Sequence, residues 1–202
     1  RCVKACAERG VSALTVFAFS SENWSRPPEE VSGLMELLAR AIGREVPQLA
    51  RDGIRVRFVG DRASLSVQLR AGLEQAESET AHCQLMLLNI CFNYGGRWDI
   101  AQAAAGLAAR GEAITPESLD RAMALSHVRD PDLLIRTGGE MRLSNFLLWQ
   151  AAYSELVFSD KLWPDFDEAA LDSAIAAYHA RERRFGLISE QLASESPVLA
   201  RA

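Results

Sequence analysis

The sequence has 202 residues, of which 49% are hydrophobic and 24% charged, proportions typical of one globular domain with a sizeable core. The formal net charge of −5 argues against the broad basic face that nucleic-acid binding requires, so we expect no nucleic-acid partner. No apolar run approaches the length of a membrane span and no signal peptide is visible, so we expect a cytoplasmic protein.

The first part of the chain is predicted to alternate between helix and strand. A helix is already under way at the first residue, with no capping residue before it. The β-branched and aromatic residues from Leu14 to Phe19 predict a strand. After a polar loop, Pro28 favours a helix start, and apolar residues at helical spacing extend that helix to about Leu49. Pro47 is expected to kink or end it.

The remaining elements continue the alternation. We predict strands over 54–59, 85–92, 133–135 and 156–158, and helices over 64–80, 98–109, from Pro116 onward, and from about Asp167 to Phe185. The 85–92 run is apolar throughout, which indicates a strand buried on both faces. Strands that alternate with helices predict an α/β fold, with a single central, mostly parallel sheet and helices on both faces. We expect one domain over residues 1–202.

The loop after the 133–135 strand carries the strongest chemical pattern. It reads Arg136-Thr-Gly-Gly-Glu-Met-Arg142-Leu-Ser144, in which two glycines allow a sharp turn and a close approach to a ligand. Arginine forks match phosphate oxygens with paired hydrogen bonds, and open α/β sheets bind ligands at the carboxyl ends of their strands. The loop therefore predicts a diphosphate site. The alternative from spacing alone is an ordinary turn with solvated arginines.

Four segments together resemble the cis-prenyltransferase family, in family order and over nearly the whole chain. They are the stretch from Asp130 to Phe158, Phe19 to Pro27 (FSSENWSRP), Asn93 to Ile100 (NYGGRWDI), and Trp163 to Phe166 (WPDF) with Arg181 to Gly186 (RERRFG). The resemblance implies a transferase that condenses isopentenyl diphosphate onto farnesyl diphosphate with cis double bonds. The product would be undecaprenyl diphosphate, a lipid carrier precursor for cell-wall sugars.

The resemblance also implies roles for particular residues. Arg136, Arg142, Leu143 and Ser144 would bind the isopentenyl diphosphate head group, and Glu155 would be the acidic ligand of Mg²⁺. Asn23 would be the catalytic residue that assists proton removal. An amide is a poor base, so positioning of substrate and proton acceptor is the more physical role. The other substrate-binding candidates are Ser20, Ser21, Glu22, Trp24, Arg26 and Glu30, with Glu30 expected to orient Arg26 by pairing with it.

Several of these residues have a plainer alternative. Without the resemblance, Trp24 reads as a core aromatic residue, Glu30 as a helix-start charge and Glu155 as an exposed acid before a strand. The NYGGR segment is expected to be a structural motif near the site. The candidate walls of an apolar product tunnel, for each of which core packing is an equal alternative, are Ala18, Leu34, Met35, Leu38, Leu85 and Leu87.

Assembly and completeness are expectations from the same resemblance. It implies a homodimer, to which Phe146–Trp149 could contribute unless these residues pack in the core, and peripheral contact with a membrane during product release. The family begins with a further strand and an Asp-Gly-Asn-Gly-Arg-Trp motif that the 202 residues lack, so we expect this chain alone to be inactive. The competing classes are a non-catalytic partner subunit of a prenyltransferase and a phosphate-handling α/β hydrolase or nucleotide binder.

Overall fold

Within residues 1–181, all five strands run parallel to the strands they pair with. The structure, a computed structural model, describes residues 1–181. The larger sheet has the order β1 (Ala13–Ser20), β3 (Met86–Tyr94) and β2 (Ile54–Val59), and the smaller one pairs β4 (Leu133–Arg136) with β5 (Glu155–Phe158). The α/β class and the parallel strands are thus confirmed, while the ladders divide the predicted sheet into two parts.

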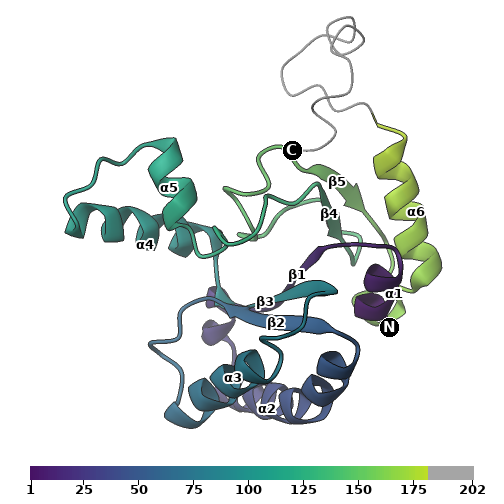
Figure 1. Ribbon diagram of the computed structural model, residues 1–202, viewed down its shortest axis with the longest axis horizontal. Helices are drawn as coiled ribbons and strands as arrows, with labels where there is room; N and C mark the ends of the chain where they lie inside the picture. Colours follow the sequence, from purple (N-terminus) through teal and green to yellow (C-terminus); the bar gives the residue numbers. More distant parts are fainter. Residues whose placement is uncertain (182–202) are drawn as a thin grey trace, which may run out of the picture.

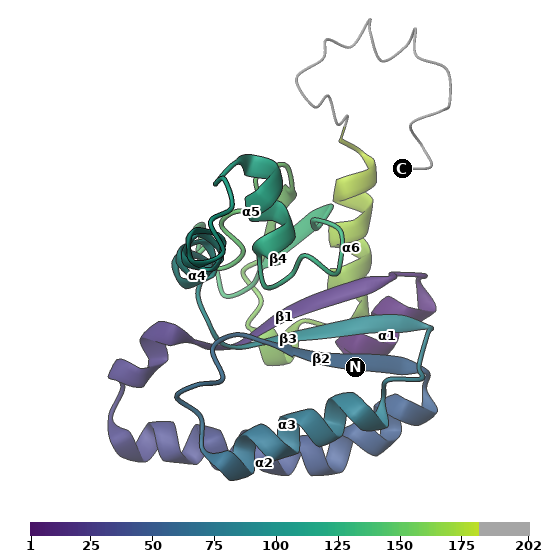
Figure 2. The same cartoon turned by 60° about the vertical axis from the view of Figure 1, so that its left-hand side comes forward.

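Helices lie on both sides of the larger sheet (Figures 1 and 2). The long α2 (Pro28–Arg51) and α3 (Val67–Glu79) lie side by side and cover one face. On the other side α4 (Gly96–Ala109) and α5 (Pro116–Ala122) contact each other, while Leu134 of β4 and loop residues such as Leu125 and Leu147 pack against Cys91. The remaining helices, α1 (Cys2–Glu8) and α6 (Glu168–His179), contact each other near the amino ends of the strands. Two short 3-10 turns, η1 (Ser21–Ser25) and η2 (Trp163–Asp165), follow β1 and precede α6.

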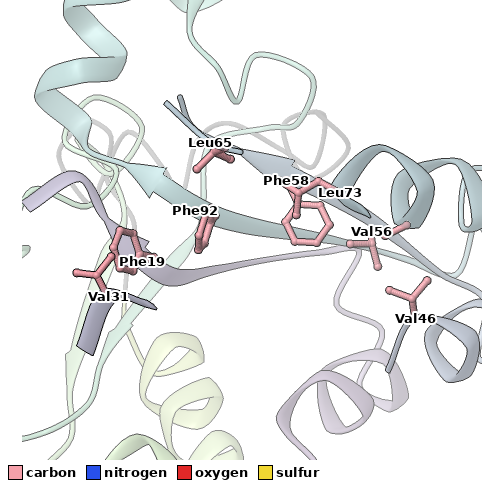
Figure 3. Packing of buried hydrophobic residues seen from close by; sticks show 9 residues of the cluster. Phe19, Val31, Val46, Val56, Phe58, Leu65, Leu73 and Phe92 are labelled. Carbon is pink, nitrogen blue, oxygen red and sulfur yellow. The ribbon is translucent and has the colours of Figure 1, made fainter. Parts of the chain in front are cut away.

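The main core lies between the larger sheet and the α2–α3 layer. Alternate residues of β2 point into it, and aromatic rings from β1 and β3 close its end beneath η1. Figure 3 shows this cluster, which comprises Phe19, Val31, Val46, Val56, Phe58, Leu65, Leu73, Ala76 and Phe92. The side chains opposite, Arg55 and Arg57, are exposed, which is the alternation expected of a strand with one covered face.

The helix α2 continues through Pro47 and ends at Arg51, so the predicted interruption does not occur. Proline removes one backbone hydrogen bond and crowds the carbonyl four residues earlier. That residue is Gly43, and the neighbouring Val46 is buried against the sheet, so packing holds the last turns in place. Among residues 1–181, none of the helices combines the length and the apolar character needed to cross a membrane.

Candidate diphosphate site

The loop that follows β4 is fixed by glycines and by the segment after β5. Gly138 and Gly139 have φ values of 88° and 73°, which L side chains rarely adopt. The Gly138 N–H donates to the carbonyl of Lys161 at 2.8 Å, and the Gly139 N–H donates to Ser159 at 3.0 Å. These bonds hold the turn against the neighbouring strand end, so its two flanking arginines start from a defined backbone.

Arg136 and Arg142 converge on one carboxylate. Both guanidinium groups contact Glu140, Arg142 through Nη2 and Oε1 at 2.5 Å. The hydrogen bond from Arg136, together with the charge of Arg142, lowers the pKa of the Glu140 carboxyl against the opposing effect of desolvation. Sequence reasoning missed Glu140, although an acid between two arginines was the available signal. The two arginines are therefore close enough to bind one anion.

Arg136 also has hydrogen-bonding capacity left over. Its Nε is inaccessible to solvent and has no hydrogen-bond partner among residues 1–181. A buried guanidinium N–H without an acceptor is costly, so its presence in a native structure needs an explanation. An oxyanion bound at that position would accept a hydrogen bond from the Arg136 Nε–H.

Within the η1 turn, the side-chain oxygen of Asn23 is already occupied by a hydrogen bond. The Asn23 Oδ1 accepts a hydrogen bond from the Ser20 N–H at 2.8 Å, which closes the turn directly after β1. The polar group that this leaves for a substrate is the Nδ2 amide, a donor. This geometry supports the orienting role that we expected for Asn23 over the role of a base.

Trp24 is fixed by the end of β3. Its Nε1 donates to Asn93 Oδ1 at 2.7 Å, and its ring meets Phe19 edge to face. Asn93 has a left-handed backbone (φ 51°), and its Nδ2 donates to Asp61 O and Ser64 Oγ. The indole ring remains 40% exposed, so Trp24 is neither a buried core residue nor a free one. The NYGGR motif thus supports the turn that carries Asn23.

The other predicted residues of the turn are paired. Arg26 Nη1 donates to Glu30 Oε1 at 2.6 Å, which confirms the expected pairing. Ser21 Oγ donates to Glu22 Oε2 at 3.1 Å. Desolvation opposes ionisation of Glu22, but hydrogen bonds from its own backbone, Asn145, Ser20 and Ser21 lower the pKa of its carboxyl. Glu22 is therefore an anion, and its carboxylate holds the side chains of Ser21 and Asn145 in place by accepting their hydrogen bonds.

The three motifs meet at the carboxyl ends of β1 and β3. Ser20 and Tyr94 are register partners at that end, and the Gly96 N–H donates to the Asn145 carbonyl at 2.7 Å. The loop that contains Arg142 and Ser144 is thereby joined to the start of α4 and to η1. Ser144 is exposed, with a left-handed backbone (φ 50°).

The family profile described as putative undecaprenyl diphosphate synthase matches residues 1–186. The chain belongs to this family. An isoprenyl transferase of Neisseria gonorrhoeae is 53% identical over 191 residues, which cover 94% of this chain and 77% of that protein. A ditrans,polycis-undecaprenyl-diphosphate synthase of Xanthomonas axonopodis pv. citri, described as (2E,6E)-farnesyl-diphosphate specific, is 50% identical over 204 residues and covers 97% of this chain and 79% of its own length.

Solved structures agree with the family assignment. A probable undecaprenyl diphosphate synthase from Campylobacter jejuni has a TM-score of 0.86 at 34% identity, covering 92% of this chain and 88% of its own. Lavandulyl diphosphate synthase from Lavandula x intermedia, in complex with dimethylallyl diphosphate, has a TM-score of 0.87 at 34% identity, covering 91% and 83%. The chain is therefore a cis-prenyltransferase, and the non-catalytic partner subunit has no support from these relatives.

Glu155, the acidic metal ligand that the family resemblance implies, does not lie beside the arginine pair. It begins β5 opposite Leu133, whereas Arg136 lies opposite Phe158 at the other end of the ladder, roughly 10 Å along the strand direction. Its Oε2 accepts a hydrogen bond from Arg181 at 2.8 Å. Within residues 1–181, no three His, Cys, Asp or Glu side chains cluster as a metal site. We refer to Arg136 and Arg142 together as the arginine clamp. The side chains of residues 1–181 do not fit a magnesium centre beside it.

The candidate tunnel walls behave differently from one another. Leu34, Met35 and Leu38 of α2 are partly buried and pack against the main core. Ala18 is exposed at a register irregularity of β1. Leu85 is 62% exposed, precedes β3 and therefore cannot be a tunnel wall on a strand.

The segment from Phe146 to Trp149 packs in the core. Leu147 is buried, and the Phe146 ring stacks on Phe17 with centroids 4.6 Å apart. The packing alternative for this segment is thus the observed one. Of the expected tail motif, residues 182–186 lie outside the described residues.

Proposed function

We propose that the chain condenses isopentenyl diphosphate units onto farnesyl diphosphate with cis double bonds, giving undecaprenyl diphosphate. Family membership supports prenyl transfer, and the names of the relatives support these substrates. The observation that carries the proposal for this chain is the convergence of Arg136 and Arg142 on Glu140. Two guanidinium groups that already share one carboxylate can share one diphosphate.

The proposed division of labour follows from the contacts. The diphosphate of isopentenyl diphosphate takes the place of the Glu140 carboxylate, and its oxygens also reach Arg136 Nε and the hydroxyl of Ser144. Asn23 donates from Nδ2 and orients the reacting groups while C4 of isopentenyl diphosphate bonds to C1 of farnesyl diphosphate. The diphosphate of farnesyl diphosphate leaves as pyrophosphate, and a nearby acceptor takes the proton lost from C2 of isopentenyl diphosphate. Trp24 borders the reacting end. The growing hydrocarbon lies along the partly buried apolar stripe of α2, where each methylene removed from water contributes about 0.8 kcal/mol.

Magnesium is proposed as the ion that accompanies the diphosphates, because Mg²⁺ binds through substrate phosphates and one or two carboxylates. When bound, it neutralises phosphate charge. Glu155 stays a prediction as its ligand, since its carboxylate is paired with Arg181 away from the clamp. Removal of Mg²⁺ with a chelator should abolish turnover, and full activity in excess chelator would contradict the requirement.

We also propose that the enzyme acts as a homodimer in the cytoplasm and contacts a membrane peripherally when it releases its apolar product. Exposed apolar side chains after β5 support the dimer, and the release step supports the membrane contact. Co-sedimentation of the protein with lipid vesicles only in the presence of product would support the contact, and absence of binding in both states would contradict it.

The test is a condensation assay of the full-length protein with both diphosphates. Arg142→Ala should raise KM for isopentenyl diphosphate about 10- to 100-fold, because hydrogen bonds to charged groups contribute about 1.5–3 kcal/mol. Arg142→Lys should recover only part of this, since a lysine lacks the bidentate fork. Arg110→Ala, which removes an exposed arginine paired with Glu112, is the matched control and should leave KM unchanged. An unaltered KM in Arg142→Ala would contradict the site, and full-length wild-type protein without turnover would contradict the activity.

A further inference from the structure

Asn145 has an unusual backbone. It lies in a stretch where Ser144, Asn145 and Leu147 all adopt left-handed conformations, with φ values of 50°, 63° and 47°. Each such residue costs free energy unless it is glycine, and asparagine tolerates the conformation best. A loop that maintains three of them must be held by strong contacts elsewhere.

The polar groups of Asn145 provide those contacts. Its Nδ2 donates to Glu22 Oε1 at 2.5 Å, and its Oδ1 accepts from the Arg97 N–H at 2.9 Å. Its carbonyl accepts from the Gly96 N–H at 2.7 Å. Asn145 therefore joins the loop that carries Arg142 and Ser144, called the clamp loop below, to two other elements. These are η1, whose Glu22 lies 123 residues away in sequence, and the first turn of α4.

The neighbouring glycines are needed for this contact. A Cβ on Gly95 would lie 2.6 Å from Asn145 Nδ2 and from Ser21 Oγ, and a Cβ on Gly96 would lie 2.7 Å from Leu148 Cγ. The two glycines of the NYGGR motif thus allow the clamp loop to approach, in addition to allowing the turn after β3.

The direction of the hydrogen bond to Glu22 is fixed by chemistry. An ionised carboxylate only accepts, so residue 145 must donate to Glu22 with one side-chain atom and accept from α4 with the other. Asparagine meets both demands with a short side chain. Aspartate would keep the acceptor and place a second carboxylate against Glu22.

We propose that Asn145 is a positioning residue for the condensation, which fixes the loop of Arg142 and Ser144 relative to the turn of Asn23. This inference rests on the proposed function. Without the bridge, the two loops keep their own local hydrogen bonds but lose their common register. The isopentenyl diphosphate held by one loop is then misplaced against the reacting groups held by the other.

The experiment compares Asn145→Asp, Asn145→Gly and each of these combined with Glu22→Gln, in the full-length protein. Both single variants should lose about 10- to 100-fold in kcat/KM, the scale that follows from misplacing reacting groups by about an ångström. KM for isopentenyl diphosphate should rise as kcat falls. In Asn145→Asp/Glu22→Gln the introduced amide can donate to the introduced carboxylate, so the bond is rebuilt with reversed polarity and activity should recover. Asn145→Gly/Glu22→Gln should not recover.

Gln75→Glu is the matched control, since it also turns an amide donor into a carboxylate beside a glutamate, Glu79, but on the exposed face of α3. It should leave both constants unchanged. A variant that only loses folded protein lowers apparent kcat without raising KM, and thermal unfolding reports that loss separately. Unchanged constants in Asn145→Asp, or equal behaviour of the two double variants, would overturn the inference. Inactive full-length wild-type protein would instead contradict the proposed function itself.

Discussion

His127 makes the stability of the fold depend on pH. Its Nε2 is 2.9 Å from Asn89 Oδ1, and Asn89 is fully buried in β3. Desolvation, together with the charges of Arg57 and Arg55, lowers the pKa of His127 against a weaker opposing hydrogen bond with the Ala124 backbone. The neutral ring is therefore the form that the folded state prefers.

The sign of this effect follows from proton binding. Below the usual histidine pKa of about 6.5 the unfolded chain binds the proton more readily, so stability is lost as the pH falls. We expect the urea midpoint to fall between pH 7 and pH 5, and to fall less in His127→Gln, which can still donate to Asn89. Parallel profiles for the two proteins would show that another group is responsible.

At the level of single residues, the sequence is informative where partners are close in the chain. Arg26 and Glu30, one helical turn apart, pair as predicted. The partners of Glu22 and Trp24 lie 123 and 69 residues away, and no local spacing indicates them. The same reason explains why Asn145 was missed, since its role depends on which loops the fold brings together.

The loop between β2 and α3 depends on a backbone contact that only glycine permits. Gly60 has a φ of 145°, and a Cβ there would lie 1.9 Å from the Phe92 carbonyl oxygen. Gly60→Ala should destabilise the fold by about 2–6 kcal/mol, because backbone strain and overpacking each cost about 1–3 kcal/mol. Gly72→Ala, in α3 with nothing within 4 Å, should stabilise by up to about 1 kcal/mol. Denaturant midpoints that do not move in opposite directions would contradict this.

The elements themselves follow well from sequence patterns, and their ends less so. The strand β2 has the predicted bounds, whereas β3 extends to Tyr94 and α4 begins at Gly96, two residues earlier than expected. Gly96 is already helical, and its N–H, which has no acceptor within the first turn, donates to the Asn145 carbonyl from a distant loop. The continuation of α2 through Pro47 is likewise decided by tertiary packing.

The division of strands between two ladders could not be read from the sequence. Alternation predicts parallel strands and right-handed crossovers, but not which neighbours pair. Within residues 1–181, β1 pairs only with β3 and β4 only with β5, and β4–β5 lies beyond β1 in Figure 1. The placement of Glu155 at the opposite ladder end from Arg136 is a direct result of the register, which sequence patterns do not specify.

The proposed dimer is testable on the surface after β5. Phe158, Leu162 and Trp163 are 37%, 61% and 55% exposed, a concentration of apolar area typical of contact surfaces. Light scattering should give a dimer for the wild type and a monomer for Trp163→Glu. Leu85→Glu, at an equally exposed leucine before β3, is the control and should stay dimeric. A monomeric wild type would contradict the dimer, and a dimeric Trp163→Glu would contradict this surface.

The contact of both clamp arginines with Glu140 has a consequence for anion selectivity. A tethered carboxylate competes at the high local concentration of an intramolecular group, on the order of millimolar for short links. Chloride or another weak monoanion binds the arginines with too little free energy to displace Glu140. A multiply charged pyrophosphoryl group can bind both arginines through several oxygens at once. Without substrate, Glu140 therefore keeps the two arginines paired and prevents common monovalent anions from binding to them. Only a ligand that binds both arginines more strongly than this carboxylate can displace it.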